Sequence, residues 1–110
     1  MPEFALFFSY SPETWAALLT KPVDRTQAVR QGIEAVGGRL VGLWYMLGED
    51  DGMVLFDVPD ASAAAAVSLA VNSSGSFSSV RIQQLLAAGD LPDVLRTADA
   101  VRGSYRRPGG

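Results

Sequence analysis

The sequence predicts a single α+β domain in which an antiparallel sheet of four strands carries its helices on one face. The chain has 110 residues, the usual length of one domain, and 48% of them are hydrophobic, enough to form a core. Apolar runs typical of strands alternate along the chain with helical patterns. Two of these runs flank a short connection that contains Asp51 and Gly52, a pair typical of a β-hairpin.

A strand and a helix are expected at the start of the chain. Residues 4–10 are apolar and rich in aromatic side chains, which is typical of a buried strand. Ser11 is expected to cap the helix that follows, because Pro12 suits the first helical position. That helix must end near Pro22, since a proline disfavours helical backbone in the residue before it.

A second helix and a hairpin are expected next. Asp24 is expected to cap this helix, and the pair of glycines that begins at Gly37 is expected to end it. Residues 39–47 and 53–58 are apolar runs separated by a five-residue connection, so they predict the two strands of the hairpin.

The last part of the chain predicts a helix, a strand and a final helix. Asp60 is expected to cap an alanine-rich helix over residues 61–71, whose small side chains allow it to lie close to the sheet. Residues 77–86 predict the fourth strand. Asp90 is expected to cap the final helix over residues 91–101.

This β-α-β-β-α-β order, with its first helix broken in two and a C-terminal helix added, predicts a ferredoxin-like split βαβ fold. Helices on one face would leave seven apolar residues on the other, namely Ala5, Phe7, Val41, Leu43, Tyr45, Met53 and Leu55. An apolar surface of this extent is rarely left in water. The sequence therefore predicts a homo-oligomer, most simply a two-fold homodimer with its sheets facing each other.

Short motifs spread over residues 4–88 carry a family resemblance. They follow the first strand, end the second helix, form the hairpin and precede the alanine-rich helix: Tyr10-Ser11-Pro12-Glu13, Glu34-Ala-Val-Gly-Gly-Arg-Leu40, Leu47-Gly48-Glu49-Asp50-Asp51 and Val58-Pro59-Asp60. By these motifs the chain resembles the GYD-domain proteins, and the resemblance implies a dimeric α/β-barrel but no defined activity. The family is named for a Gly-x-Tyr-Asp motif, in which Gly48 and Asp51 match and Asp50 stands in place of the tyrosine.

The composition excludes several kinds of chemistry. The chain has no cysteine and no histidine, which excludes disulfides, thiolate metal sites, Ser-His-Asp triads and histidine-bound haem. The glycines form no phosphate-binding motif between a strand and a helix. We therefore expect no nucleotide cofactor and no prosthetic group.

Charge and targeting features limit the expected partners. Residues 102–110 hold three of the 9 basic residues, so residues 1–101 carry 6 basic against 12 acidic groups. We expect one domain over residues 1–101 and a flexible basic tail over residues 102–110. An acidic body repels phosphates, so we expect no binding to nucleic acid. The sequence shows no targeting signal and no membrane helix, which predicts a cytoplasmic protein that does not bind membranes.

The hairpin connection holds the densest group of carboxylates. Glu49, Asp50 and Asp51 carry the oxygen ligands that Ca²⁺ and Mg²⁺ prefer. Adjacent residues rarely direct three carboxylates to one point, however, so we expect a solvated turn and no metal site.

Polar residues within the predicted strands indicate a possible site. Strand alternation places six residues on the sheet face away from the helices: Phe7, Ser9, Tyr45, Asp57, Arg81 and Gln83. Polar groups on an apolar face are typical of a ligand cleft, here with Asp57 and Arg81 as a charged pair and Tyr45 beside them. Alternatively, Asp57 and Arg81 form a structural ion pair at a subunit interface, or Arg81 and Gln83 lie exposed at the sheet edge.

Three functions are compatible with these observations. The first is the binding of a small, mostly apolar ligand. The second is an enzyme of the oxygenase, isomerase or cyclase type, without a cofactor, that acts on a small aromatic or polyketide-like substrate through Asp57 or Tyr45. The third is a structural or interaction protein. The sequence contains no nucleophile–base pair, which favours binding over catalysis.

Overall fold

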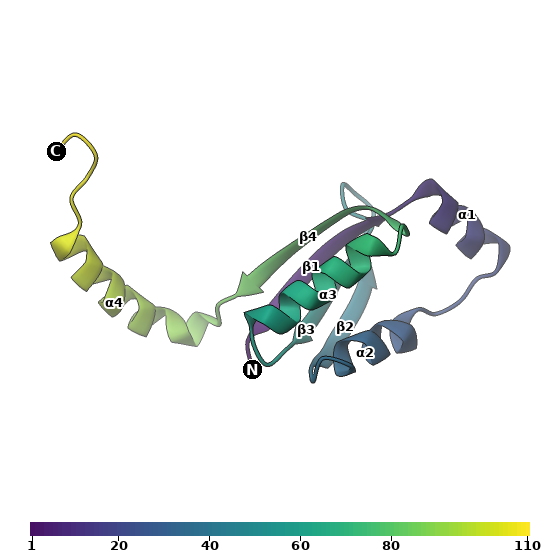
Figure 1. The fold of residues 1–110 in the computed structure, drawn as a ribbon, viewed down its shortest axis with the longest axis horizontal. Coiled ribbons are helices and arrows are strands. Elements are labelled where there is room, and N and C mark those ends of the chain that lie inside the picture. The colour runs from purple at the N-terminus through teal and green to yellow at the C-terminus, as the bar shows by residue number, and fades with distance from the viewer.

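The computed structural model describes all 110 residues and shows four strands and four α-helices (Figure 1). The elements, in chain order, are β1 (Glu3–Tyr10), α1 (Pro12–Thr20), α2 (Thr26–Glu34), β2 (Arg39–Tyr45), β3 (Gly52–Asp57), α3 (Ala61–Ser73), β4 (Phe77–Leu85), the short 3₁₀ helix η1 (Ala88–Asp90) and α4 (Leu91–Ser104). The α+β class predicted from the sequence is confirmed.

The four strands form one sheet in the order β2-β3-β1-β4, and every neighbouring pair is antiparallel. In the central strand β1 the even-numbered residues are buried under the helices, and the odd-numbered residues point to the other face, where Ala5 is also buried. We call this second face, which no helix covers, the open face. The central strands β3 and β1 thus contribute side chains both to the core under the helices and to the open face.

The core lies between the sheet and the helices α2 and α3. Phe56 and Val58 are completely buried, and the ring of Phe56 stacks on Phe4 with 5.9 Å between the ring centroids. Helix α2 contributes Ile33 and α3 contributes Ala64 to the same cluster. In Figure 1, α2 and α3 lie over the sheet, while α1 lies beyond its end.

Two of the four predicted helix caps are confirmed. The Ser11 side chain accepts a hydrogen bond from the backbone N–H of Thr14, and the Asp60 side chain accepts one from Ala63. The prediction for Asp24 was wrong, because its carboxylate accepts from Thr26, only two residues ahead, and so forms a turn before the helix.

The prediction that Asp90 caps α4 was also wrong. Its backbone is already helical, since η1 leads directly into α4, and its side chain makes no capping hydrogen bond. An N-cap residue needs an extended backbone to turn its side chain toward the first free N–H groups.

A β-bulge in β2 overturns the predicted facing of two residues. Leu40 pairs with Phe56, but Gly42 pairs with the next residue, Leu55, so Val41 is an extra residue without a partner. The alternation therefore reverses after the bulge. Leu43 and Tyr45, which were expected on the open face, lie on the helix side instead, and Trp44 lies on the open face.

Helix α4 stands apart from the rest of the molecule (Figure 1). The chain measures 59 × 33 × 24 Å and its radius of gyration is 17.8 Å, against about 13 Å for a compact domain of this length. Arg102, expected to begin a flexible tail, lies inside α4 and pairs with Asp99 one turn earlier. None of the helices is both long enough and apolar enough to cross a membrane.

Candidate functional site

An apolar groove lies between α2 and α3, with α1 at one end. Its volume is about 920 Å³, and 14 of its 20 lining residues are hydrophobic. The two walls carry small residues, namely Ala28 and Gly32 on α2, Ala35 directly after it, and Ala66 and Ala70 on α3. Side chains of this size cannot bridge the space between the helices, so the groove stays open.

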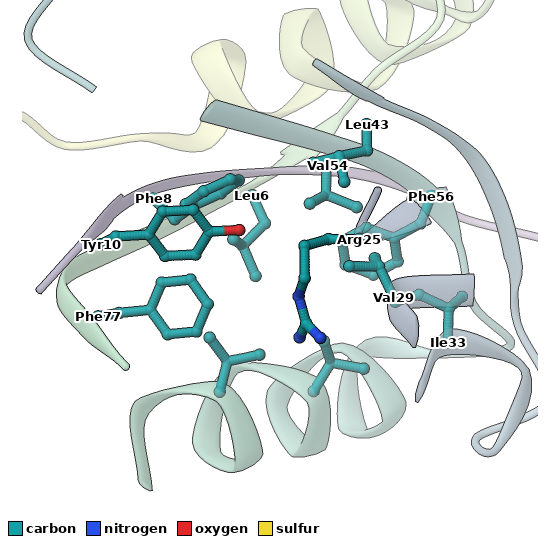
Figure 2. Close-up of a pocket in the computed structure, with 12 residues that line it drawn as sticks. Leu6, Phe8, Tyr10, Arg25, Val29, Ile33, Leu43, Val54, Phe56 and Phe77 are labelled. Carbon is teal, nitrogen blue, oxygen red and sulfur yellow. The ribbon is translucent and has the colours of Figure 1, made fainter. Parts of the chain in front are cut away.

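The floor of the groove reaches the core of the domain. A smaller cavity of about 70 Å³ lies beneath it, and its 12 lining residues include the inward side chains of β1 and β3. Figure 2 shows this cavity, with Phe8, Tyr10 and Phe77 on one side and Val29 and Ile33 on the other. A ligand in the groove would thus contact core side chains directly.

Arg25 is the single charged residue that lines this inner cavity. It directly precedes α2, and Figure 2 shows its side chain reaching into the cavity between the sheet and α3. The groove as a whole has one more charged lining residue, Lys21, at the end of α1. Both charges are positive, although the net charge of the chain is -3.

Two tyrosine hydroxyls meet beside this arginine. The hydroxyl oxygens of Tyr10 and Tyr45 lie 3.0 Å apart and share a hydrogen bond. Burial raises the pKa of Tyr10 far above its usual value, the hydrogen bond with Tyr45 acts in the same direction, and the nearby Arg25 opposes both. Tyr10 is therefore a neutral hydroxyl at any physiological pH and no general base.

The carboxylate of Asp51 connects the β2–β3 hairpin to the aromatic residues Tyr10 and Trp15. Its Oδ2 atom accepts two hydrogen bonds of 3.0 Å, from the backbone N–H of Tyr10 and from the indole N–H of Trp15. The Trp15 ring in turn packs edge-on against Tyr10, with 5.1 Å between the ring centroids. Asp51 thereby joins the β2–β3 hairpin, β1 and α1 at one point.

The expectation of a solvated carboxylate turn was wrong for two of the three residues. Asp51 is held as described, and Asp50 forms an ion pair of 2.9 Å with Arg81 on the open face. The backbone N–H of Asp51 also donates a hydrogen bond of 2.8 Å to the carbonyl oxygen of Phe8, which holds the connection against β1. No group of three or more acidic side chains converges in a way that could hold a metal ion.

Of the six site residues predicted on the open face, five lie there. Phe7, Ser9, Arg81 and Gln83 share this face by their register, and the Arg81 guanidinium lies 4.5 Å from the centre of the Phe7 ring. Asp57 lies at the end of β3 on the same face. Tyr45 does not, because of the bulge at Val41.

The predicted pair of Asp57 and Arg81 does not form. Asp57 pairs with Arg39 at 2.6 Å, and the register places it opposite Glu3, whereas Arg81 lies opposite Phe7. The two residues are therefore separated by four residues along the strands, about 13 Å, and by two strand spacings across the sheet, about 10 Å. Whether open-face residues bind a ligand stays a prediction.

Sequence analysis missed Arg25 and the groove. The sequence contained one indication. Arg25 directly precedes α2, and a positive charge at the N-terminus of a helix is repelled by the positive end of the helix dipole. A charge that is unfavourable for the helix suggests that the side chain of Arg25 serves a purpose other than helix stability. The position of Arg25 within an apolar cavity depends on the spacing of α2 and α3, which no local pattern reports.

Comparisons with known proteins identify the family. Residues 4–95 match the GYD domain, which covers the sheet, the groove and the first turn of α4. No curated protein matches the chain. The match confirms the resemblance expected from the sequence motifs and includes the fastening residue Asp51. The chain therefore belongs to the GYD domain family.

Proposed function

We propose that this protein binds a small, mostly apolar molecule in the groove between α2 and α3. The observation that carries the proposal is the groove itself, whose volume of about 920 Å³ and mainly hydrophobic lining suit a small ligand. Ligand sites of proteins are typically concave, apolar and supplied with a few polar groups. Here Arg25, Lys21 and the Tyr10 hydroxyl are those groups.

Binding fits the lining better than catalysis does. No carboxylate lines the groove, and Tyr10 stays protonated. The lining thus offers no acid–base pair of the kind that a cofactor-independent oxygenase, isomerase or cyclase would use. On the open face, the charge of Arg81 is already neutralised by Asp50, so the groove is the stronger ligand site.

Filling the groove should abolish binding. Ala70→Trp places a large side chain in the groove from an exposed position on α3, and we expect it to prevent binding of the neutral apolar dye Nile red. Ala65→Trp is the matched control, since Ala65 is exposed on the same helix but does not line the groove. Dye fluorescence in a titration measures both. Equal binding by the two variants would contradict the proposal.

We also propose that the chain adopts the ferredoxin-like arrangement of the dimeric α/β-barrel proteins. The strand order and the placement of two helices on one face support this. The open face carries Phe7, Trp44, Met53 and Leu55, and such apolar surface favours a partner. A second copy of the chain is the partner that offers the same surface.

Helix α4 supplies the second argument for a dimer of this chain. Its exposed apolar residues recur at helical spacing, as Leu91, Val94, Leu95 and Val101, and Tyr105 follows directly after the helix. The open face alone spans roughly 450 Å² in plan, less than the roughly 800 Å² per partner of a standard interface. A projecting helix with an apolar side provides further area if it packs on the partner.

A charge on the open face should produce a monomer. We expect wild-type protein to elute as a dimer, and Leu55→Asp to elute as a monomer, because an unpaired charge in an apolar interface costs several kcal/mol. Leu69→Asp is the control, since Leu69 is exposed on the outer side of α3 and lines neither surface. Light scattering after gel filtration gives the mass. A monomeric wild type at micromolar concentration would contradict the dimer.

A further inference from the structure

Arg25 is a cation in apolar surroundings. Of the 12 residues that line the inner cavity, 11 are hydrophobic and Arg25 is the exception. Figure 2 shows its guanidinium between the tyrosine and phenylalanine side of the cavity and Val29 of α2. Arg25 is exposed overall, so its guanidinium is accessible from solvent, and it lines the apolar cavity at the same time. An anion that enters the groove can therefore reach it and form charge-assisted hydrogen bonds.

No anion of the protein itself fills this role. The four ion pairs of the chain involve Arg39, Arg81, Arg96 and Arg102, and none involves Arg25. The carboxylate beside it in sequence, that of Asp24, accepts hydrogen bonds from the Thr26 N–H and hydroxyl groups instead. The groove lining contains no aspartate or glutamate. The positive charge of Arg25 therefore has no acidic partner within the chain, and its neighbour in the cavity is the neutral hydroxyl of Tyr10.

The tyrosine pair adds a hydrogen-bond donor at the same place. The hydrogen bond between the Tyr10 and Tyr45 hydroxyls uses one of their two hydrogens, whichever oxygen donates. When Tyr45 donates, the hydrogen of the Tyr10 hydroxyl remains free. Figure 2 shows the Tyr10 hydroxyl directed toward the Arg25 side chain. An acceptor placed between the two groups would contact a guanidinium and could receive a hydroxyl hydrogen as well.

We propose that the ligand of the groove is an apolar molecule that ends in a carboxylate, and that Arg25 binds this carboxylate. The inference rests on the proposed binding function and adds the class of ligand. The planar guanidinium matches a carboxylate through two parallel hydrogen bonds. The small-walled groove holds the apolar part, and Lys21 adds positive charge at the far end of α1.

Two ligands that differ only in the head group test this directly. We expect calorimetry to show that wild-type protein binds octanoate at least about tenfold more tightly than octanol, since a charge-assisted hydrogen bond is worth about tenfold or more in affinity. Arg25→Met should remove this preference and leave the octanol affinity within about twofold. Arg25→Lys, which keeps the charge but not the planar pair of donors, should retain part of the preference.

Arg30→Met is the matched control. Arg30 lies on α2, close to Arg25 in sequence, and does not line the groove. Its replacement by methionine removes the same positive charge, so this variant should bind both ligands as wild type does. Equal affinities of wild type for octanoate and octanol, or an unchanged octanoate affinity in Arg25→Met, would overturn the inference while groove binding stands. A failure of wild type to bind octanoate, octanol and Nile red would contradict the proposed function itself.

Discussion

Gly38→Ala should lower the free energy of unfolding by about 3 kcal/mol or more. An added Cβ atom would lie 2.5 Å from the carbonyl oxygen of Asp57 and 2.8 Å from side-chain atoms of Ile33 and Val58. The carbonyl belongs to β3, which is paired on both sides, so the backbone there has little freedom to move. Gly38 is required because the end of α2 approaches the sheet at this point.

Gly32→Ala is the control and should have the opposite sign. A Cβ atom at Gly32 would have no neighbour within 4 Å. Alanine stabilises a helix interior by about 0.5–1 kcal/mol relative to glycine. Urea unfolding followed by circular dichroism measures both variants. A Gly38→Ala protein as stable as wild type would mean that α2 does not approach β3 as closely as described.

Asp51→Ala should also destabilise the protein by about 3 kcal/mol, because it removes two hydrogen bonds to a charged acceptor. The variant would leave the backbone N–H of Tyr10, a buried residue, without its acceptor and would release the Trp15 indole. Asp51→Asn keeps an acceptor oxygen at the same place, so we expect a smaller loss of about 1 kcal/mol.

The neighbouring carboxylate provides the comparison for this prediction. Asp50→Asn breaks the ion pair with Arg81, whose side chain is half exposed, and such pairs contribute less than about 1 kcal/mol. Thermal unfolding of the three variants should therefore rank Asp51→Ala as the least stable. If Asp50→Asn were as unstable as Asp51→Ala, Asp51 would not be the group that fastens the hairpin.

Features fixed by a few neighbouring residues could be predicted from the sequence. The cap at Ser11 needs only Pro12 and Thr14, and the cap at Asp60 needs only Ala63. The family resemblance likewise depends on short motifs. Asp24 shows where such local reasoning fails. Its side chain accepts a hydrogen bond from the N–H of Thr26, two residues ahead, instead of from the N–H three residues ahead as in a capping box.

The candidate site depends on distances between segments remote in sequence, which explains why it was missed. Arg25 became a candidate only once α2 and α3 were seen to leave a groove between them. Asp57 was paired in the prediction with the wrong arginine, because alternation reports the face of a residue and not its place along the strand. Arg39 lies directly opposite Asp57, while Arg81 lies two strands away.

The bulge at Val41 makes the length of β2 as important as its composition. Because of one unpaired residue, Trp44 belongs to the surface that we assign to a partner copy and Tyr45 belongs to the ligand side. Straightening of the bulge at constant chain length would exchange the two aromatic residues between the two faces at once, whereas deletion of Val41 would remove the bulge and leave both residues on their present faces. Individual substitutions in β2 can therefore accumulate independently during evolution, whereas one residue inserted before Trp44 would alter both surfaces together.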